Sequence, residues 1–283
     1  MRNRWPWFLL ILVTLVVGML LWREQQMSAA DELSLETLFS LPAGAYEENT
    51  QLSLDVANPT AEIYFTLDGR TPDPANSTLY TQPIPLSADS PQVVVVRAQS
   101  FLPDGLSGPI ASATYFMGMD TSLPMMSIVV EPDDFWDEER GIYVNHAQRG
   151  RAWERPADLT YITPDGETGF QTGAGVRIHG GWTRYFSDKK SLRLYFRDEY
   201  GARKLAFPLF GNEGQIAFDH LVLHNSLQDL LLFRNQLIDQ LTVQMDGYAT
   251  RSQPLLLFIN GRPWGIYYAR ERSNERWLAE NGL

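Results

Sequence analysis

Apolar and polar residues alternate on both sides of the glycine pair Gly180-Gly181, in the second half of the chain. The alternation covers residues 176–179 before the glycines and 192–196 after them. Because successive side chains of a β-strand point to opposite faces, this pattern predicts a strand, a turn, an exposed loop and a second strand. The same alternation places Lys190 on the apolar face, where a lysine is costly without an acidic or anionic partner. A lysine at the rim of the core and a lysine directed at a phosphate both stay open.

Short strand-like runs separated by proline and glycine fill residues 42–118. Residues 62–67 are rich in strand-forming side chains and end at Asp68-Gly69, which is a turn signal. Residues 93–96 are four consecutive valines, as in a buried strand. Short strands at this spacing predict a small β-sandwich.

Residues 119–283 combine strand patterns with one helical pattern. Leucine and other apolar residues recur at helical spacing over 227–245, after a capping pattern at Ser226 and Asp229. Asn260-Gly261 separates two apolar runs, which predicts a hairpin with a type I′ turn. We therefore predict an α+β fold, in which this part is a mixed antiparallel sheet with one main helix.

An uncharged apolar run covers residues 6–22, after Arg2 and Arg4. Its length and its flanking tryptophans predict an N-terminal transmembrane helix, and the arginines favour a cytoplasmic tip with the bulk of the chain extracytoplasmic. Residues 1–23 would form the tip and the single-pass membrane anchor, and residues 24–41 would form a stalk. A cleavable signal peptide is the alternative, because small residues follow at 28–30.

The composition excludes several classes of function. The net charge of −11 argues against a nucleic-acid partner, since little would neutralise a phosphate backbone. The absence of cysteine excludes disulfides, thiolate catalysis and cysteine-based zinc sites. The acidic run over residues 133–139 predicts a solvated face, and the histidines lack ligand spacing, so we predict no metal site.

Residues 63–86 resemble the chitobiase/β-hexosaminidase C-terminal domain family. The resemblance rests on the run Tyr64–Gly69, on Thr71-Pro72 and on Tyr80. It implies an immunoglobulin-like accessory module that carries no catalytic residues.

Residues 119–283 resemble the spore-coat-protein H (CotH) kinase family through an ordered set of short motifs. These are GIYVN at 141–145, VRIHGG at 176–181, Arg184, KKSL at 189–192, LFRN at 232–235, LFING at 257–261, WGIY at 264–267 and Glu271. The resemblance implies an atypical kinase-like fold that uses ATP and a divalent metal to phosphorylate serine on bacterial surface or coat proteins. It also implies that Lys190 grips phosphate, that Arg177 and Arg184 flank the phosphate-covering hairpin, and that Glu271 lies beside the nucleotide.

The sequence departs from this family where the catalytic chemistry would lie. The chain extends about a dozen residues past Glu271, so we expect a truncated domain without the large lobe that supplies the base and the metal-binding aspartates of a kinase. No catalytic residue is therefore assigned. A membrane-anchored kinase-like protein and a non-catalytic surface scaffold both stay open. So does a carbohydrate- or protein-binding module that uses Trp182, Tyr185 and Phe186 in the exposed loop.

Overall fold

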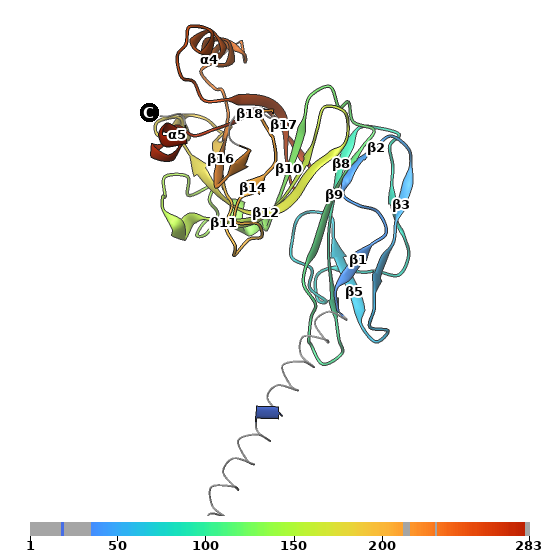
Figure 1. The fold of residues 1–283 in the computed structure, drawn as a ribbon. Coiled ribbons are helices and arrows are strands. Elements are labelled where there is room, and N and C mark those ends of the chain that lie inside the picture. Colours follow the sequence, from blue (N-terminus) through green and yellow to red (C-terminus); the bar gives the residue numbers. More distant parts are fainter. Residues whose placement is uncertain (1–17, 20–34, 212–215, 230, 281–283) are drawn as a thin grey trace, which may run out of the picture.

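The computed structural model describes residues 18–19, 35–211, 216–229 and 231–280. A β-sandwich and a closed β-barrel lie side by side (Figure 1). The sandwich strands are β1 Thr37–Phe39, β2 Gly44–Tyr46, β3 Thr50–Leu52, β4 Leu54–Val56, β5 Glu62–Thr66, β6 Thr78–Leu79, β7 Ile84–Leu86, β8 Gln92–Phe101 and β9 Ala111–Met117. The barrel strands are β10 Met125–Val130, β11 Arg155–Ile162, β12 Thr168–His179, β13 Ser191–Tyr195, β16 His220–His224, β17 Ser252–Ile259 and β18 Arg262–Arg270. The remaining elements are α2 Pro132–Trp136, the 3₁₀ turn η1 Arg151–Trp153, α3 Thr183–Phe186, the strand pair β14 Leu205–Ala206 and β15 Ala217–Phe218, α4 Arg234–Gln244 and α5 Glu275–Glu280.

The sandwich is built around the long strand β8, as its valine run predicts. The main sheet has the order β2-β9-β8-β5-β6, and the small pairs β1-β4 and β3-β7 complete the domain. Val96 and Ala98 of β8 pack in the core with Leu52, Leu86 and Tyr115. The turn after β5 passes through Gly69 at φ 87°, a conformation that glycine adopts without strain.

The barrel closes through a strand pair that the local sequence pattern does not reveal. Its order is β10-β11-β12-β13-β16-β18-β17, and β10 returns to pair in parallel with β17, with Met125 opposite Leu256. Inward side chains from all seven strands form one core, which includes Val176, Leu192 and Leu194. The hairpin β17–β18 turns at Asn260 and Gly261 with positive φ at both residues, which confirms the predicted type I′ turn.

The predicted α+β class is wrong for the described part of the chain. Strands dominate both domains, and the second domain is a closed barrel where a mixed antiparallel sheet was expected. The physical reason is the parallel β10–β17 pair: it joins the two strands that would otherwise be the edges of the sheet, and the inward side chains of the closed sheet form one core.

The main helix of the second domain is shorter than predicted. Of the predicted helix over 227–245, only Arg234–Gln244 is helical, as α4. Ser226 and Leu232 adopt positive φ, which is incompatible with a right-handed helix in the preceding residues. The buried Asp229 accepts a hydrogen bond from the Asn235 backbone N–H at 3.1 Å, so its carboxylate serves the new helix start. The apolar side chains of α4, including Leu237 and Ile238, are exposed.

The predicted N-terminal transmembrane helix lies almost entirely outside the described residues, which begin, apart from residues 18–19, at residue 35. No helix within the described ranges is both long enough and apolar enough to cross a bilayer. That part of the fold prediction is not supported.

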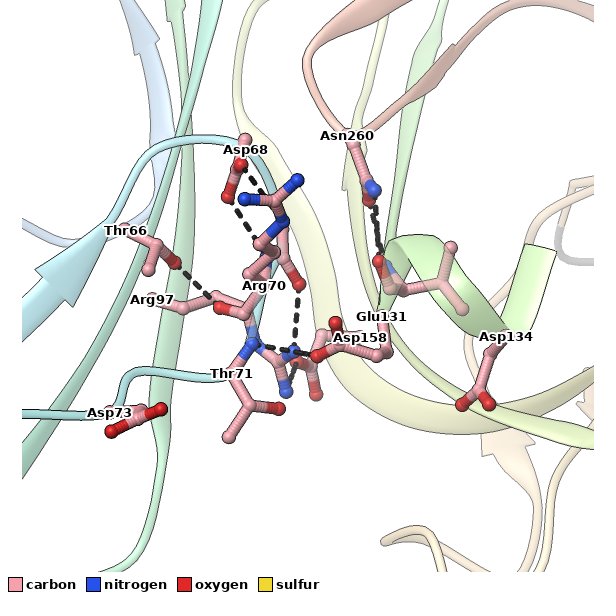
Figure 2. Close-up of polar contacts among 12 residues, drawn as sticks. Thr66, Asp68, Arg70, Thr71, Asp73, Arg97, Glu131, Asp134, Asp158 and Asn260 are labelled. Atoms are coloured by element: carbon pink, nitrogen blue, oxygen red, sulfur yellow. Dashed lines mark hydrogen bonds and ion pairs between the residues drawn. The ribbon is translucent and has the colours of Figure 1, made fainter. Parts of the chain in front are cut away.

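Two turns join the sandwich to the barrel (Figure 2). Asn260 bonds the Val130 backbone through both its amide oxygen, at 2.9 Å, and its amide nitrogen, at 2.8 Å. A Cβ on Gly69 would lie 2.5 Å from the Asn260 side chain, so only glycine lets the sandwich turn approach this closely. The Thr71 backbone N–H donates to Glu131 at 2.7 Å, and Arg97 lies 3.8 Å from the same carboxylate. The Asn260–Val130 bonds hold the barrel turn that Gly69 meets, and the Gly69 approach and the contacts to Glu131 fix the sandwich against the side of the barrel that carries α2.

Candidate functional site

A pocket of about 370 Å³ opens at the end of the β12–β13 hairpin. Its walls come from three parts of the barrel domain: residues 142–153, the two strands, and α3. Its titratable lining residues in the described part of the chain include no Asp or Glu. They are Arg149, Arg177, His179, Arg184, Arg193 and Tyr195. A hollow lined by four guanidinium groups attracts an anion.

The register of β12 and β13 places two of these arginines side by side. Arg177 lies directly opposite Arg193, while their neighbours Val176 and Leu194 point into the barrel core. Like charges at directly opposed positions destabilise a sheet. This pairing therefore needs either an internal carboxylate or a bound anion.

Glu154 neutralises one member of the pair. Its side chain is fully buried, and it accepts hydrogen bonds from Arg177 Nε at 2.7 Å and from Arg197 Nε at 2.8 Å. Burial alone would raise the pKa of Glu154, but the hydrogen bonds from Arg197 and Arg177 outweigh it and lower that pKa. The Arg177 guanidinium lies over the Tyr195 ring, 4.0 Å from its centroid, so it is held in one place.

Arg193 has no such carboxylate. Its Nη1 donates to the Tyr195 hydroxyl at 3.1 Å and its Nη2 donates to His179 Nδ1 at 2.9 Å, both neutral acceptors. Its Nε is buried and has no hydrogen-bond partner within the described residues. Burial lowers the pKa of Arg193. A pocket-lining cation without a carboxylate partner in the described structure is the feature that an anionic ligand would satisfy.

Arg184 connects two walls of the pocket. This buried guanidinium donates from Nε to the Gly180 carbonyl at 2.8 Å and from Nη1 to the His146 carbonyl at 2.7 Å. It also donates to the carbonyls of Gln148 and Ile178. Burial, and then the nearby Arg149, lower the pKa of Arg184. Its charge is solvated by backbone carbonyls only, which leaves the pocket positive.

Lys190 is buried, as the alternation predicts, but it is not among the residues that line the pocket. Its ammonium donates to the Arg184 carbonyl at 2.9 Å and to the Ser187 carbonyl at 3.1 Å. Burial lowers the pKa of Lys190, and Asp188 opposes that effect. Lys190 therefore holds the loop that carries Arg184.

Glu271 lies elsewhere on the domain. Its carboxylate accepts hydrogen bonds from Arg251 Nε at 3.0 Å and from Trp277 Nε1 at 3.3 Å, so it joins the ends of β17 and β18 to α5. The structure thus brings Arg177 and Arg184 together in the pocket and places Lys190 behind the Arg184 loop. It does not bring Glu271 to the pocket lining.

Sequence reasoning missed four residues of this site, namely Arg149, Glu154, His179 and Arg193. The strand alternation already directs Arg193 away from the core, and a hairpin register would have placed it opposite Arg177. No local signal shows that Glu154, more than twenty residues earlier, reaches the same two strands.

The pocket fits the phosphate groups of ATP better than it fits a metal ion. Arg193 and Arg149 are guanidinium groups without a carboxylate partner in the described structure, and they suit phosphate oxygens. The described residues contain no group of three His, Asp or Glu side chains that could hold a divalent metal. The residues present therefore do not fit a divalent metal, and we assign no step of a reaction to one.

Two family models each match a part of the chain. Residues 176–283 match the family model described as CotH kinase protein, and residues 41–111 match the chitobiase/beta-hexosaminidase C-terminal domain. The order and the identity of both confirm the resemblances drawn from the sequence. No curated protein matches the chain. Arg177, His179, Arg184 and Arg193 lie within the CotH match, whereas Arg149 and Glu154 precede it.

Proposed function

We propose, from the premise that the chain carries a CotH kinase domain behind a chitobiase/hexosaminidase C-terminal-like domain, that the barrel binds ATP at the arginine pocket. The single observation that carries this proposal is Arg193, a cation that lines the pocket and has no carboxylate partner in the described part of the chain. The triphosphate would supply that missing counter-charge. The reaction class is phosphoryl transfer to serine on a partner protein.

The role of this chain's own residues in that reaction is to hold the nucleotide. Arg193 and Arg149 would bind phosphate oxygens, and Arg177 is held by Glu154 beside them. Arg184 and Lys190 keep the loop over the pocket in place through backbone carbonyls. Because no carboxylate lines the pocket in the described structure, the proposal assigns no catalytic base.

The proposal also covers the location of the domain and the protein that accepts the phosphate. The proposal places the domain outside the cytoplasm with a surface or coat protein as the phosphate acceptor, and a chain without cysteine is compatible with an oxidising compartment. A second candidate function is non-catalytic binding of such a partner. It is favoured by Trp182 and Phe186, whose rings stack at 4.1 Å while the two side chains stay 61% and 63% exposed.

Titration calorimetry of the full chain with ATP and with adenosine tests the proposal. We expect ATP to bind roughly tenfold or more tightly than adenosine, since one charge-assisted hydrogen bond contributes about 1.5–3 kcal/mol. Adenosine is the matched control because it carries the same base and sugar without phosphate. Equal affinity for the two ligands, or no binding of ATP, would contradict phosphate recognition at this pocket.

A further inference from the structure

The hydrogen bond with Arg193 determines which ring nitrogen of His179 carries the proton. Arg193 Nη2 lies 2.9 Å from His179 Nδ1, and a guanidinium group has donors only. Nδ1 must therefore accept this hydrogen bond with its lone pair. A neutral imidazole with an accepting Nδ1 carries its proton on Nε2.

The second ring nitrogen is left for a ligand. His179 lines the pocket, and its Nε2 makes no hydrogen bond to any residue in the described part of the chain. The preceding residue, Ile178, points into the barrel core, so the backbone of β12 directs the His179 ring outward. The pocket therefore contains a neutral N–H donor next to the uncompensated Arg193.

The groups around the ring keep it neutral. Burial lowers the pKa of His179 to about 3, and the charges of Arg193, Arg272, His224 and Arg184 act in the same direction. These groups come from β13, from the segment after β18, from β16 and from α3. None of them is a carboxylate that would favour the protonated ring.

We propose that His179 is a specificity-determining residue, whose neutral Nε2–H donates to a phosphoryl oxygen of the nucleotide beside Arg193. This inference rests on the proposed function and deepens it. A donor that stays uncharged between pH 5 and pH 8 fixes the position of the phosphoryl oxygen through the geometry of its hydrogen bond, and it adds no positive charge to the pocket. The change in ATP affinity over that range should then follow the ionisation of ATP itself, with no contribution from His179.

Long-range ¹H–¹⁵N NMR spectroscopy of the full chain tests the protonation state. We expect one Nε2–H tautomer of His179 from pH 5 to pH 8, and a shift of its Nε2 resonance when ATP is added. A ring that titrates near the ordinary histidine value of 6.5, or that carries its proton on Nδ1, would overturn the inference. This measurement needs no variant that could fail to fold.

Calorimetry on variants separates a binding role from a structural one. His179→Ala should weaken ATP binding roughly three- to tenfold, the effect of losing one neutral hydrogen bond of about 0.5–1.5 kcal/mol. His179→Gln, whose amide can donate in place of Nε2, should recover part of that loss. His220→Ala is the control, because His220 does not line the pocket. Wild-type affinity in His179→Ala would overturn this inference alone, whereas a wild-type chain that binds no ATP would overturn the proposed function together with it.

Discussion

Replacing Glu154 with glutamine should lower the free energy of unfolding by about 3 kcal/mol, the low end of the range for breaking a buried ion pair. Glutamine keeps the shape of the side chain but removes the negative charge that accepts hydrogen bonds from Arg177 at 2.7 Å and from Arg197 at 2.8 Å. The two guanidinium groups would then lie on either side of Tyr195 without the buried carboxylate that bridges them. The estimate is at the low end because Arg197 is one-third exposed and partly screened by water. Urea denaturation of the two proteins measures the difference.

Glu199→Gln provides the matched control for that prediction. Glu199 pairs with Arg151, and both side chains are more than two-fifths exposed, so its loss should cost less than about 1 kcal/mol. The pH dependence gives a second check. Because the folded-state pKa of Glu154 is lowered, its contribution is complete above the unfolded-state value of 4.5 and is lost as the pH falls through the folded-state pKa. A Glu154→Gln protein as stable as wild type at pH 7, or a difference that persists unchanged in acid, would disprove the role of this carboxylate.

Replacing Arg193 with methionine should weaken ATP binding roughly ten- to hundredfold, since the lost charge-assisted hydrogen bond is worth about 1.5–3 kcal/mol. Methionine keeps the aliphatic stem of the side chain and removes the guanidinium group. The fold should survive, because Arg193 donates only to Tyr195 and His179 and holds no carboxylate in the described structure. Calorimetric titration with ATP gives the affinity, and thermal denaturation shows whether the variant is folded.

Arg203→Met is the control for the arginine variant. Arg203 is exposed and lies outside the pocket, so its removal changes the net charge equally without touching the site. If both variants lost the same affinity, the effect would come from the overall field of the protein and the specific role of Arg193 would be wrong.

Local sequence patterns predicted the parts of the fold that local physics determines. Four consecutive valines indicated the buried strand β8, and Asn260-Gly261 indicated the type I′ hairpin, because each signal lies within a few residues. The inward position of Lys190 followed from strand alternation in the same way. Two of the predicted site residues, Arg177 and Arg184, line one pocket because both belong to the strand–loop–strand segment that the alternation identified.

The features that the sequence did not predict depend on contacts between segments that are distant along the chain. Closure of the barrel requires β10 to pair with β17, more than a hundred residues later, and nothing in either strand specifies that neighbour. The helix was predicted too long because its spacing continues through Leu232, whose positive φ is set by the surrounding structure. Arg251 donates to the Glu271 carboxylate at the open end of the β17–β18 hairpin, away from the pocket where the resemblance placed Glu271.

The most direct measurement is a crystal structure of the full chain with ATP bound. The account predicts phosphate oxygens within hydrogen-bond distance of Arg193 and of His179 Nε2, inside the pocket formed by residues 142–153, α3 and the β12–β13 hairpin. ATP bound at any other place on the barrel, with no phosphate oxygen near the Arg193 guanidinium, would contradict it.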